Sequence, residues 1–387
     1  MAMNDIPKRA DNEALTLCFH SSIAEIPASE WNSLTGISHP FTRYEFLSAL
    51  EKNDCLGQQF GWHPYHLSVR DTNQQLVGVC PLYIKTNSYG EFVFDWSWAS
   101  AYEQVGLEYY PKIVCCVPYN PVEGARLITH DPIIKQVMIK QIIKVAEKMK
   151  MSGMHWLFTN DEDTATLKSE NLALRLGCQY HWKNHDYSSF EDYLSTFMSR
   201  KRKKVKRERR MVQEQNISIE IVHGDEASEQ QITLAQQYYK NTFDKKFGFP
   251  TLSLDFFKEI CSTMGQQIVF MFALLEGKYI ACAITLRSDD ALFGRFWGCE
   301  HEYHSLHFET CFYQGIDYCI QHNLQRFEPG AQGEHKITRG FLPTKTWSAH
   351  WISDPQFRNP IYSFCKREQR AMLEQCEELF TLSPFKD

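Results

Sequence analysis

Residues 268–297 read IVFMFALLEGKYIACAITLRSDDALFGRFW. Three apolar stretches, Val269–Leu275, Tyr279–Arg287 and Ala291–Gly298, are separated by the short polar segments EGK and SDD. Stretches of this length that are rich in Ile, Val, Phe and Tyr and bounded by Gly, Asp and Ser are typical of β-strands joined by tight turns. The region therefore predicts three consecutive antiparallel strands.

The first half of the chain carries a run of the same kind. Strands are predicted at Tyr65–Arg70, Leu76–Lys85 and Phe92–Trp96, and this run also ends on Trp. Predicted helices precede each run, and a further helix and strand follow it. Repetition of one α+β unit is the simplest explanation. We therefore expect an α+β protein of two similar domains, each with a mixed, mostly antiparallel sheet flanked by helices.

The expected organisation has four parts. They are a mobile N-terminal tail at 1–14, a first domain at 15–187, a basic connecting helix at 188–215 and a second domain at 216–387. The length of 387 residues agrees with this division, because single domains usually hold about 100 to 200 residues.

The composition is that of an ordinary globular protein, with 43% hydrophobic and 23% charged residues. Its longest apolar run, Ile268–Leu275, is much shorter than the roughly 20 residues of a membrane-spanning helix. Charges from Asp5 to Glu13 interrupt the N-terminus, where a secretory signal would be apolar. The thirteen cysteines are scattered and include no C-x-x-C pair. We expect reduced thiols, no metal site, no transmembrane segment and a cytoplasmic location.

The segment 200–210 has the strongest local signal in the chain. It reads RKRKKVKRERR, with nine basic residues and the single acid Glu208. Ser188, followed three residues later by Glu191, predicts a capping box at the start of this helix. A dense positive strip on a chain of net charge −6 favours an anionic partner. The alternatives are a solvated linker helix and a helix lying on a membrane surface. The expected phosphate-binding residues are Arg200, Lys201, Arg202, Lys203, Lys204, Lys206 and Arg207.

A glycine-rich loop, EPGAQGEHK at 328–336, follows the strand predicted at Arg326–Glu328. Dense polar groups directly after a strand suit a functional loop on a rigid scaffold. Amide formation needs a base for the proton of the amine and donors for the oxyanion. Glu334 or His335 is the expected base, with Glu309 and Glu328 next, and Lys336, Arg339 or backbone N–H groups are the expected donors. A solvated hairpin is the alternative.

Several motifs together resemble the bacterial FemAB-like family, whose members are predicted N-acyltransferases of peptidoglycan biosynthesis or recognition. The resemblance runs from about Leu15 to Phe380. The motifs are Lys85-x4-Gly90-Glu91-x3-Asp95-Trp96, the basic helix, FGRFW at 293–297, HFE at 307–309 and the loop at 328–336. The loop is the most specific of them.

This resemblance implies two tandem GNAT-like domains that transfer an acyl or aminoacyl group to an amine, which could belong to a cell-wall precursor. In a GNAT-like module the loop between the first two helices borders the acceptor cleft, so Tyr239 and Lys246 are expected substrate contacts. The remaining expected substrate-binding residues are Arg295, Trp297, His307, Glu309, Glu328 and Gln332.

One departure bears on the acyl donor, which is expected as a co-substrate and not as a tightly bound cofactor. GNAT enzymes cradle the CoA pyrophosphate on a glycine-containing loop before the central helix. The corresponding segment here, CEHEYHSLHF at 299–308, contains no glycine. Aminoacyl-tRNA or an acyl group on a carrier protein is therefore expected ahead of acyl-CoA, with anionic lipid as a further peripheral partner. The alternatives are a catalytically silent module that binds a cell-wall precursor or RNA, and a CoA-dependent small-molecule N-acyltransferase.

Overall fold

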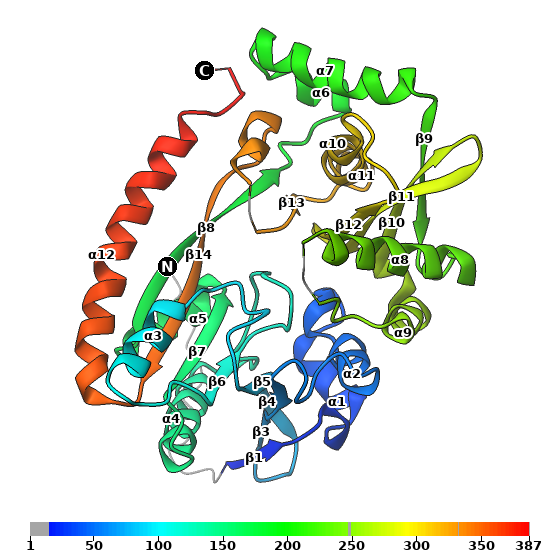
Figure 1. Ribbon diagram of the computed structural model, residues 1–387. Coiled ribbons are helices and arrows are strands. Elements are labelled where there is room, and N and C mark those ends of the chain that lie inside the picture. The colour runs from blue at the N-terminus through cyan, green and yellow to red at the C-terminus, as the bar shows by residue number, and fades with distance from the viewer. Residues whose placement is uncertain (1–14, 247–248, 332, 387) are drawn as a thin grey trace, which may run out of the picture.

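The computed structural model describes residues 15–246, 249–331 and 333–386, so the predicted tail at 1–14 lies outside the described residues. The strands form one large sheet and one small sheet with helices on their faces (Figure 1). The small sheet has the order β1 (Thr16–His20), β3 (His66–Arg70), β4 (Leu76–Cys80). The large sheet has the order β2 (Trp62–Pro64), β5 (Leu82–Lys85), β6 (Lys112–Cys115), β7 (Gly153–Thr159), β14 (Leu342–Ile352), β8 (Ala173–Lys183), β13 (Arg326–Glu328), β12 (Ala291–Cys299), β11 (Lys278–Arg287), β10 (Ile268–Leu275), β9 (Ile217–His223).

The three strands predicted from 268–297 are present as β10, β11 and β12. They pair antiparallel in sequence order, with Phe272 opposite Cys282 and Ala283 opposite Trp297. Helix α8 (Glu229–Lys246) packs against β12 so closely that a Cβ on Gly298 would lie 1.7 Å from the backbone oxygen of Tyr238. Glycine is therefore required at this crossing of helix and strand.

The first half follows the predicted pattern only in part. The run predicted as one strand at Leu76–Lys85 is broken at Pro81 into β4 and β5, which belong to different sheets. The proline has no N–H for a strand ladder, which explains the break. The strand predicted at Phe92–Trp96 is wrong: Phe92 has φ 61°, and helix α3 (Trp96–Gln104) begins where the strand was expected to end.

The last strand, β14, is inserted into the first half of the sheet. It pairs antiparallel with β7 on one side and with β8 on the other, and helix α12 (Pro355–Phe380) packs along β8 and β14 (Figure 1). Strand β8 also pairs antiparallel with β13, with Phe327 opposite Trp182. The sheet therefore runs across the division expected at residue 216, and residues from the end of the chain complete the first half.

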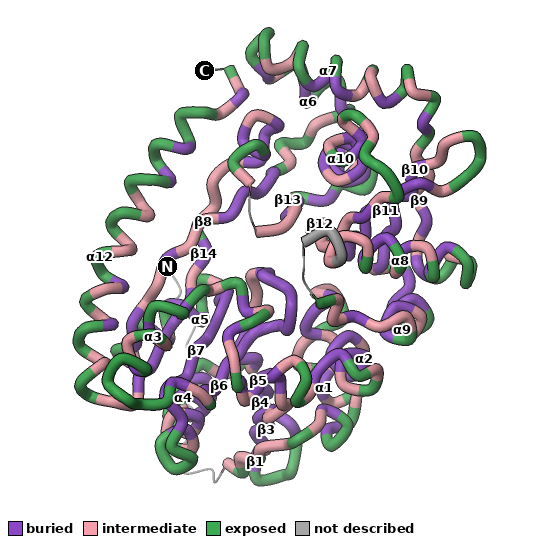
Figure 2. Tube along the Cα trace, viewed as in Figure 1, coloured by how far each residue is buried: buried purple, intermediate pink, exposed green. Residues whose placement is uncertain are grey.

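The two halves also share one hydrophobic core. Helix α2 (Tyr44–Lys52) contacts α9 (Leu254–Met264), and the Phe46 and Phe256 rings have centroids 5.6 Å apart. Phe41 meets Phe293 of β12 at 5.2 Å. Buried segments follow the strands and the inner helix faces, whereas much of α12 is exposed (Figure 2). The two halves are thus held together by apolar burial as well as by the sheet.

The first half is completed by α1 (Ala28–Thr35), α4 (Pro132–Lys148) and α5 (Asp161–Ser169). None of the described helices has the length and apolar character that crossing a membrane requires.

The basic segment forms two helices, α6 (Phe190–Ser195) and α7 (Ser199–Glu214). The capping box predicted at Ser188 is wrong by one residue. Ser189 is the N-cap, and its Oγ accepts a hydrogen bond from the backbone N–H of Asp192 at 3.1 Å. Asp192 in turn accepts from the backbone N–H of Ser188 at 3.0 Å. Both serines can cap a helix, and the carboxylate of Asp192 binds Ser188, the residue before the N-cap Ser189.

Candidate active site

A cavity of about 560 Å³ lies among α8, β12, the helical segment 306–321 and the glycine-rich loop. Most of its wall is apolar, and Phe92 from the first half contributes to it. The structure brings six of the predicted site residues to this cavity, namely Tyr239, Arg295, Trp297, His307, His335 and Lys336. An apolar cavity that holds a few convergent polar groups is the usual form of a small-molecule site.

The helical segment 306–321, which precedes the glycine-rich loop, is not a regular α-helix. It starts as α10 (Leu306–Phe308), continues as a π-helical turn (Glu309–Tyr313) and ends as α11 (Gln314–Gln321). Cys311 and Phe312 from the π-helical turn line the cavity. Such turns are rare and frequently occur at functional sites. This feature was not predicted from the sequence.

Lys336 is the most unusual ionisable group of the cavity. It lies in the 3₁₀ segment Glu334–Arg339 and is 4% exposed, and its Nζ donates to the backbone oxygen of Gly330 at 2.7 Å. Burial, together with the positive charge of Arg295, lowers the pKa of Lys336 to about 7. Near neutral pH the side chain of Lys336 can therefore be present both as the ammonium, which donates a proton, and as the neutral amine, which accepts one.

Arg295 and Glu328 form a loose pair beside Lys336. The Arg295 Nη2 lies 3.9 Å from Glu328 Oε2, and the two side chains are 3% and 2% exposed. Among the described residues, the buried Nε and Nη2 of Arg295 have no hydrogen-bond partner. Burial raises the pKa of Glu328 to about 7 and lowers that of Arg295 to about 10. Unsatisfied donors this deeply buried are costly, and a ligand oxygen in the cavity would satisfy them.

The four residues predicted to be catalytic take different positions. His335 and Lys336 border the cavity, and burial, with the charges of Arg339 and Lys336, lowers the pKa of His335. Glu334 is exposed at the start of the 3₁₀ segment. Arg339 is buried, with its Cζ 3.5 Å from the centroid of the Phe308 ring and its guanidinium bound to Glu208. Arg339 therefore anchors the 3₁₀ segment to α7 and is not part of the cavity lining.

The other residues predicted to bind substrate also differ in where the structure places them. The Tyr239 Oη accepts from the backbone N–H of Thr251 at 2.9 Å, so only its ring is available to the cavity. Glu309 accepts from Arg209 of α7 at 3.2 Å and from Gln314 at 2.7 Å. Gln332 and the side chain of Lys246 lie outside the described residues.

The predicted phosphate-binding residues lie on α7, whose inner face is formed by Val205, Glu208 and Val212. The helix runs along one edge of the molecule (Figure 1). The exposed members are Arg200, Lys203, Lys204, Lys206 and Arg207, and the half-buried members are Lys201 and Arg202. Together they form a positively charged surface on α7, which contacts the 3₁₀ segment Glu334–Arg339 beside the cavity. Among the described residues, no cluster of three or more His, Cys, Asp or Glu side chains could hold a metal ion.

Sequence reasoning missed a second, smaller cavity of about 280 Å³. It is lined by Arg175, Ser348 and Glu368 and shares two wall residues, Phe92 and Ala331, with the larger cavity. No local signal could have found it, because its lining comes from β7, β8, β14, α12 and two loops.

The fold is a mixed α+β fold whose two halves share one large sheet. The chain belongs to the FemAB-like family, described by its role in peptidoglycan biosynthesis or recognition, whose pattern matches residues 22–387. No curated protein sequence shows significant similarity to it.

Solved structures with similar folds have little sequence identity with the chain. The C-terminal domain of a putative lysylphosphatidylglycerol synthetase from Agrobacterium fabrum aligns at a TM-score of 0.53 and 8% identity, over 91% of this chain and 98% of that one. FemX aligns at 0.52 and 11% identity, over 88% and 98%. A tandem GNAT protein from the clavulanic acid biosynthesis pathway aligns at 0.46 and 9% identity, over 88% and 99%.

Proposed function

We propose that the protein transfers an acyl or aminoacyl group to an amine from an activated donor whose carbonyl lies in the 560 Å³ cavity. The observation that carries this proposal is the pair of buried cations, Arg295 and Lys336, that border an otherwise mostly apolar cavity. Arg295 has two N–H-bearing atoms that the described residues leave unsatisfied.

Acyl transfer to an amine passes through a tetrahedral intermediate with an anionic oxygen. Donors that are already fixed in a water-poor site stabilise that oxygen strongly, because they need no reorganisation during the reaction. In this proposal Arg295 and the protonated form of Lys336 receive the oxygen. The amine attacks the carbonyl carbon, the C–N bond forms, and the bond to the leaving oxygen or sulfur of the donor breaks.

The nature of the donor and acceptor is inferred from charge and from the relatives. The exposed cations of α7 favour a donor that carries phosphates, such as aminoacyl-tRNA or an acyl carrier protein, both of which fit a cytoplasmic location. The family description favours a cell-wall precursor as acceptor. The relation in fold to a putative lysylphosphatidylglycerol synthetase makes the hydroxyl of an anionic lipid the rival acceptor to test against an amine. Segment 299–308 places Glu300 and Glu302 where CoA-binding GNAT enzymes have a glycine loop, so we propose that CoA is not the donor.

The experiment is a binding and turnover panel on the full-length protein. Aminoacyl-tRNA, acyl carrier protein and acetyl-CoA are titrated calorimetrically, and each donor that binds is incubated with peptidoglycan precursors or phosphatidylglycerol. We expect the phosphate-bearing macromolecular donors to bind and to transfer their acyl group. Low-micromolar binding of acetyl-CoA would overturn the assignment of the donor. Transfer to phosphatidylglycerol alone would overturn the amine acceptor, and binding without transfer to either acceptor would indicate a silent recognition module.

A further inference from the structure

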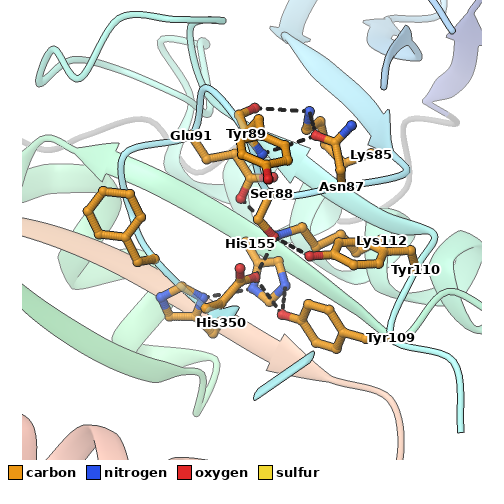
Figure 3. A network of polar contacts seen from close by, with 12 residues as sticks. Lys85, Asn87, Ser88, Tyr89, Glu91, Tyr109, Tyr110, Lys112, His155 and His350 are labelled. Carbon is orange, nitrogen blue, oxygen red and sulfur yellow. Dashed lines mark hydrogen bonds and ion pairs between the residues drawn. The ribbon is translucent and has the colours of Figure 1, made fainter. Parts of the chain in front are cut away.

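A second group of buried polar side chains lies in the first half, around Lys112 (Figure 3). The Lys112 Nζ is fully buried, 2.8 Å from Glu91 Oε2 and 2.9 Å from Ser88 Oγ, and it also contacts Asp95. Two carboxylates thus share one ammonium group. The neighbouring Lys85 does not restore the balance, because burial lowers its pKa to about 7. Burial raises the pKa of Glu91 to about 7, whereas that of Asp95 is lowered to about 2 beside Lys112, so Glu91 is the carboxylate of this cluster that can take up and keep a proton.

A continuous series of hydrogen bonds leads away from this cluster through Tyr109 and across the two strands β7 and β14. The Tyr109 Oη donates to Asp95 at 2.6 Å and lies 3.3 Å from His155 Nε2 on β7. His155 Nδ1 lies 2.7 Å from His350 Nδ1 on β14 (Figure 3). The His350 Nε2 lies 2.9 Å from Ser348 Oγ, which lines the 280 Å³ cavity. The chain therefore connects a cavity wall to a buried charge cluster.

The donor and the acceptor of every hydrogen bond in this series can be assigned by starting from the Asp95 carboxylate. Burial lowers the pKa of His155 to about 3 and that of His350 well below its usual value, so both rings are neutral. Because the single hydroxyl proton of Tyr109 goes to the Asp95 carboxylate, His155 Nε2 must carry a proton and donate it to Tyr109.

His155 Nδ1 is then an acceptor, so His350 donates from Nδ1 and accepts at Nε2. It follows that Ser348 donates its hydroxyl proton to His350.

This assignment limits what Ser348 can bind. Since its proton is engaged with His350, Ser348 offers the cavity only oxygen lone pairs, and a ligand group there must be a hydrogen-bond donor. The Arg175 guanidinium in the same wall is neutralised by Glu368, with Nε–Oε2 2.6 Å and Nη2–Oε1 2.8 Å. Aromatic side chains supply much of the remaining wall, among them Phe92, Phe94 and Phe158. The site therefore fits an amine that carries an apolar or aromatic group.

We propose that the acceptor amine binds in this second cavity and that Ser348, His350, His155, Tyr109 and Asp95 form a relay that removes its ammonium proton. The proposal rests on the acyl transfer proposed above. The shared wall residues Phe92 and Ala331 place the two cavities side by side, so that a deprotonated amine borders the cavity of the acyl carbonyl.

Each proton transfer in this relay has a donor and an acceptor among the protein's own residues. The ammonium passes a proton to Ser348 Oγ, and the serine proton moves to His350 Nε2. The His350 Nδ1 proton then moves to His155 Nδ1, and the His155 Nε2 proton moves to Tyr109. Tyr109 passes its own proton to Asp95. Lys112 then gives a proton to Glu91 and takes the one on Asp95. The amine becomes neutral, both histidines stay neutral, and Glu91 holds the proton until it is released to solvent. The amine loses its next proton to the leaving group when the amide forms.

The test uses benzylamine as the probe and needs no acyl donor. Difference infrared spectra of the full-length protein are recorded on addition of benzylamine, together with ¹⁵N spectra of the histidine rings of the free protein. We expect a protonated carboxyl band in the wild type and its loss in Tyr109→Phe. Tyr110→Phe is the matched control, because Tyr110 bonds to Ser88 at 2.8 Å and lies outside the relay. Ser348→Ala should weaken benzylamine binding about tenfold, because one hydrogen bond is lost.

The relay is overturned if the carboxyl band persists in Tyr109→Phe, or if the ¹⁵N spectra place the His350 proton on Nε2. Absence of saturable benzylamine binding at millimolar concentration overturns the amine assignment. Lys336→Met should leave the carboxyl band unchanged, so a failed relay and a failed acyl transfer give different results.

Discussion

Arg339 and Glu208 form a buried ion pair, with Nη2 2.8 Å from Oε1 and Nε 3.2 Å from Oε2. Glu208 is the only acid in the basic run 200–210, and Arg339 ends the 3₁₀ segment that carries His335 and Lys336. Tyr313 of the π-helical turn also donates to Glu208. The positive surface of α7 is therefore fixed to the wall of the larger cavity.

Removing the Glu208 charge should destabilise the fold. Glu208→Gln leaves the buried guanidinium of Arg339 without its counter-charge, and loss of one partner of a buried pair typically lowers the free energy of unfolding by about 3–5 kcal/mol. Glu214→Gln on the same helix is the control, because Glu214 pairs with Arg210 at the surface, with side chains 64% and 66% exposed. Its effect should stay below about 1 kcal/mol. Urea denaturation measures both, and equal effects would contradict the anchoring role.

Lys336 should act on the chemical step. Lys336→Met keeps the size of the side chain and removes a donor to the developing oxyanion, so kcat should fall by about 10² to 10³. The Kd of the donor should change little, because the interaction forms mainly in the transition state. Lys345→Met, at an exposed position on β14, is the matched control. Transfer kinetics with the donor found in the panel decide the question, and wild-type kcat in Lys336→Met would remove this residue from the mechanism.

Glu328 should make stability depend on pH. Its pKa is raised from 4.5 to about 7 by burial, so the folded state holds this proton more tightly than the unfolded state does. The resulting stabilisation is present below about pH 4.5 and is lost as the pH rises toward 7, by an amount on the order of 3 kcal/mol. Glu328→Gln should remove this part of the pH dependence, whereas Glu276→Gln in an exposed turn should not. Denaturation curves between pH 4 and 8 compare the variants, and parallel curves for wild type and Glu328→Gln would contradict the assignment.

The surface of α7 should bind polyanions in a salt-dependent manner. Replacing Arg200, Lys203 and Arg207 with Gln removes three exposed cations, and each lost phosphate contact should flatten the plot of log affinity against log salt by roughly 0.7 to 0.9. The triple variant of Lys140, Lys144 and Lys148, which are exposed along α4, removes the same charge elsewhere. Filter binding of tRNA at several salt concentrations tests both. An equal loss in the two triple variants would indicate an effect of net charge alone.

The sequence predicted the parts of this protein that depend on neighbours in the chain. The apolar runs of β10, β11 and β12 follow from period and turn residues. The loop at 328–336 was predicted to be functional because its polar groups follow a strand directly, and several of its residues line the larger cavity. The strand predicted at Phe92–Trp96 was wrong because alternation does not reveal that Glu91 and Asp95 turn inward to Lys112, 21 and 17 residues away.

Only the tertiary structure decided how distant segments combine. Strand β14 enters the first half of the sheet between β7 and β8, and this placement alone brings His350 to His155, 195 residues away in sequence. The same holds for Glu208 and Arg339, which are 131 residues apart. Local sequence sets backbone preference and the pattern of burial, but buried charges are matched only when separate strands and helices meet. The sequence therefore determined the strands of the second half and the loop beside the larger cavity, while long-range packing decided the second cavity, the relay and the anchoring of the basic helix.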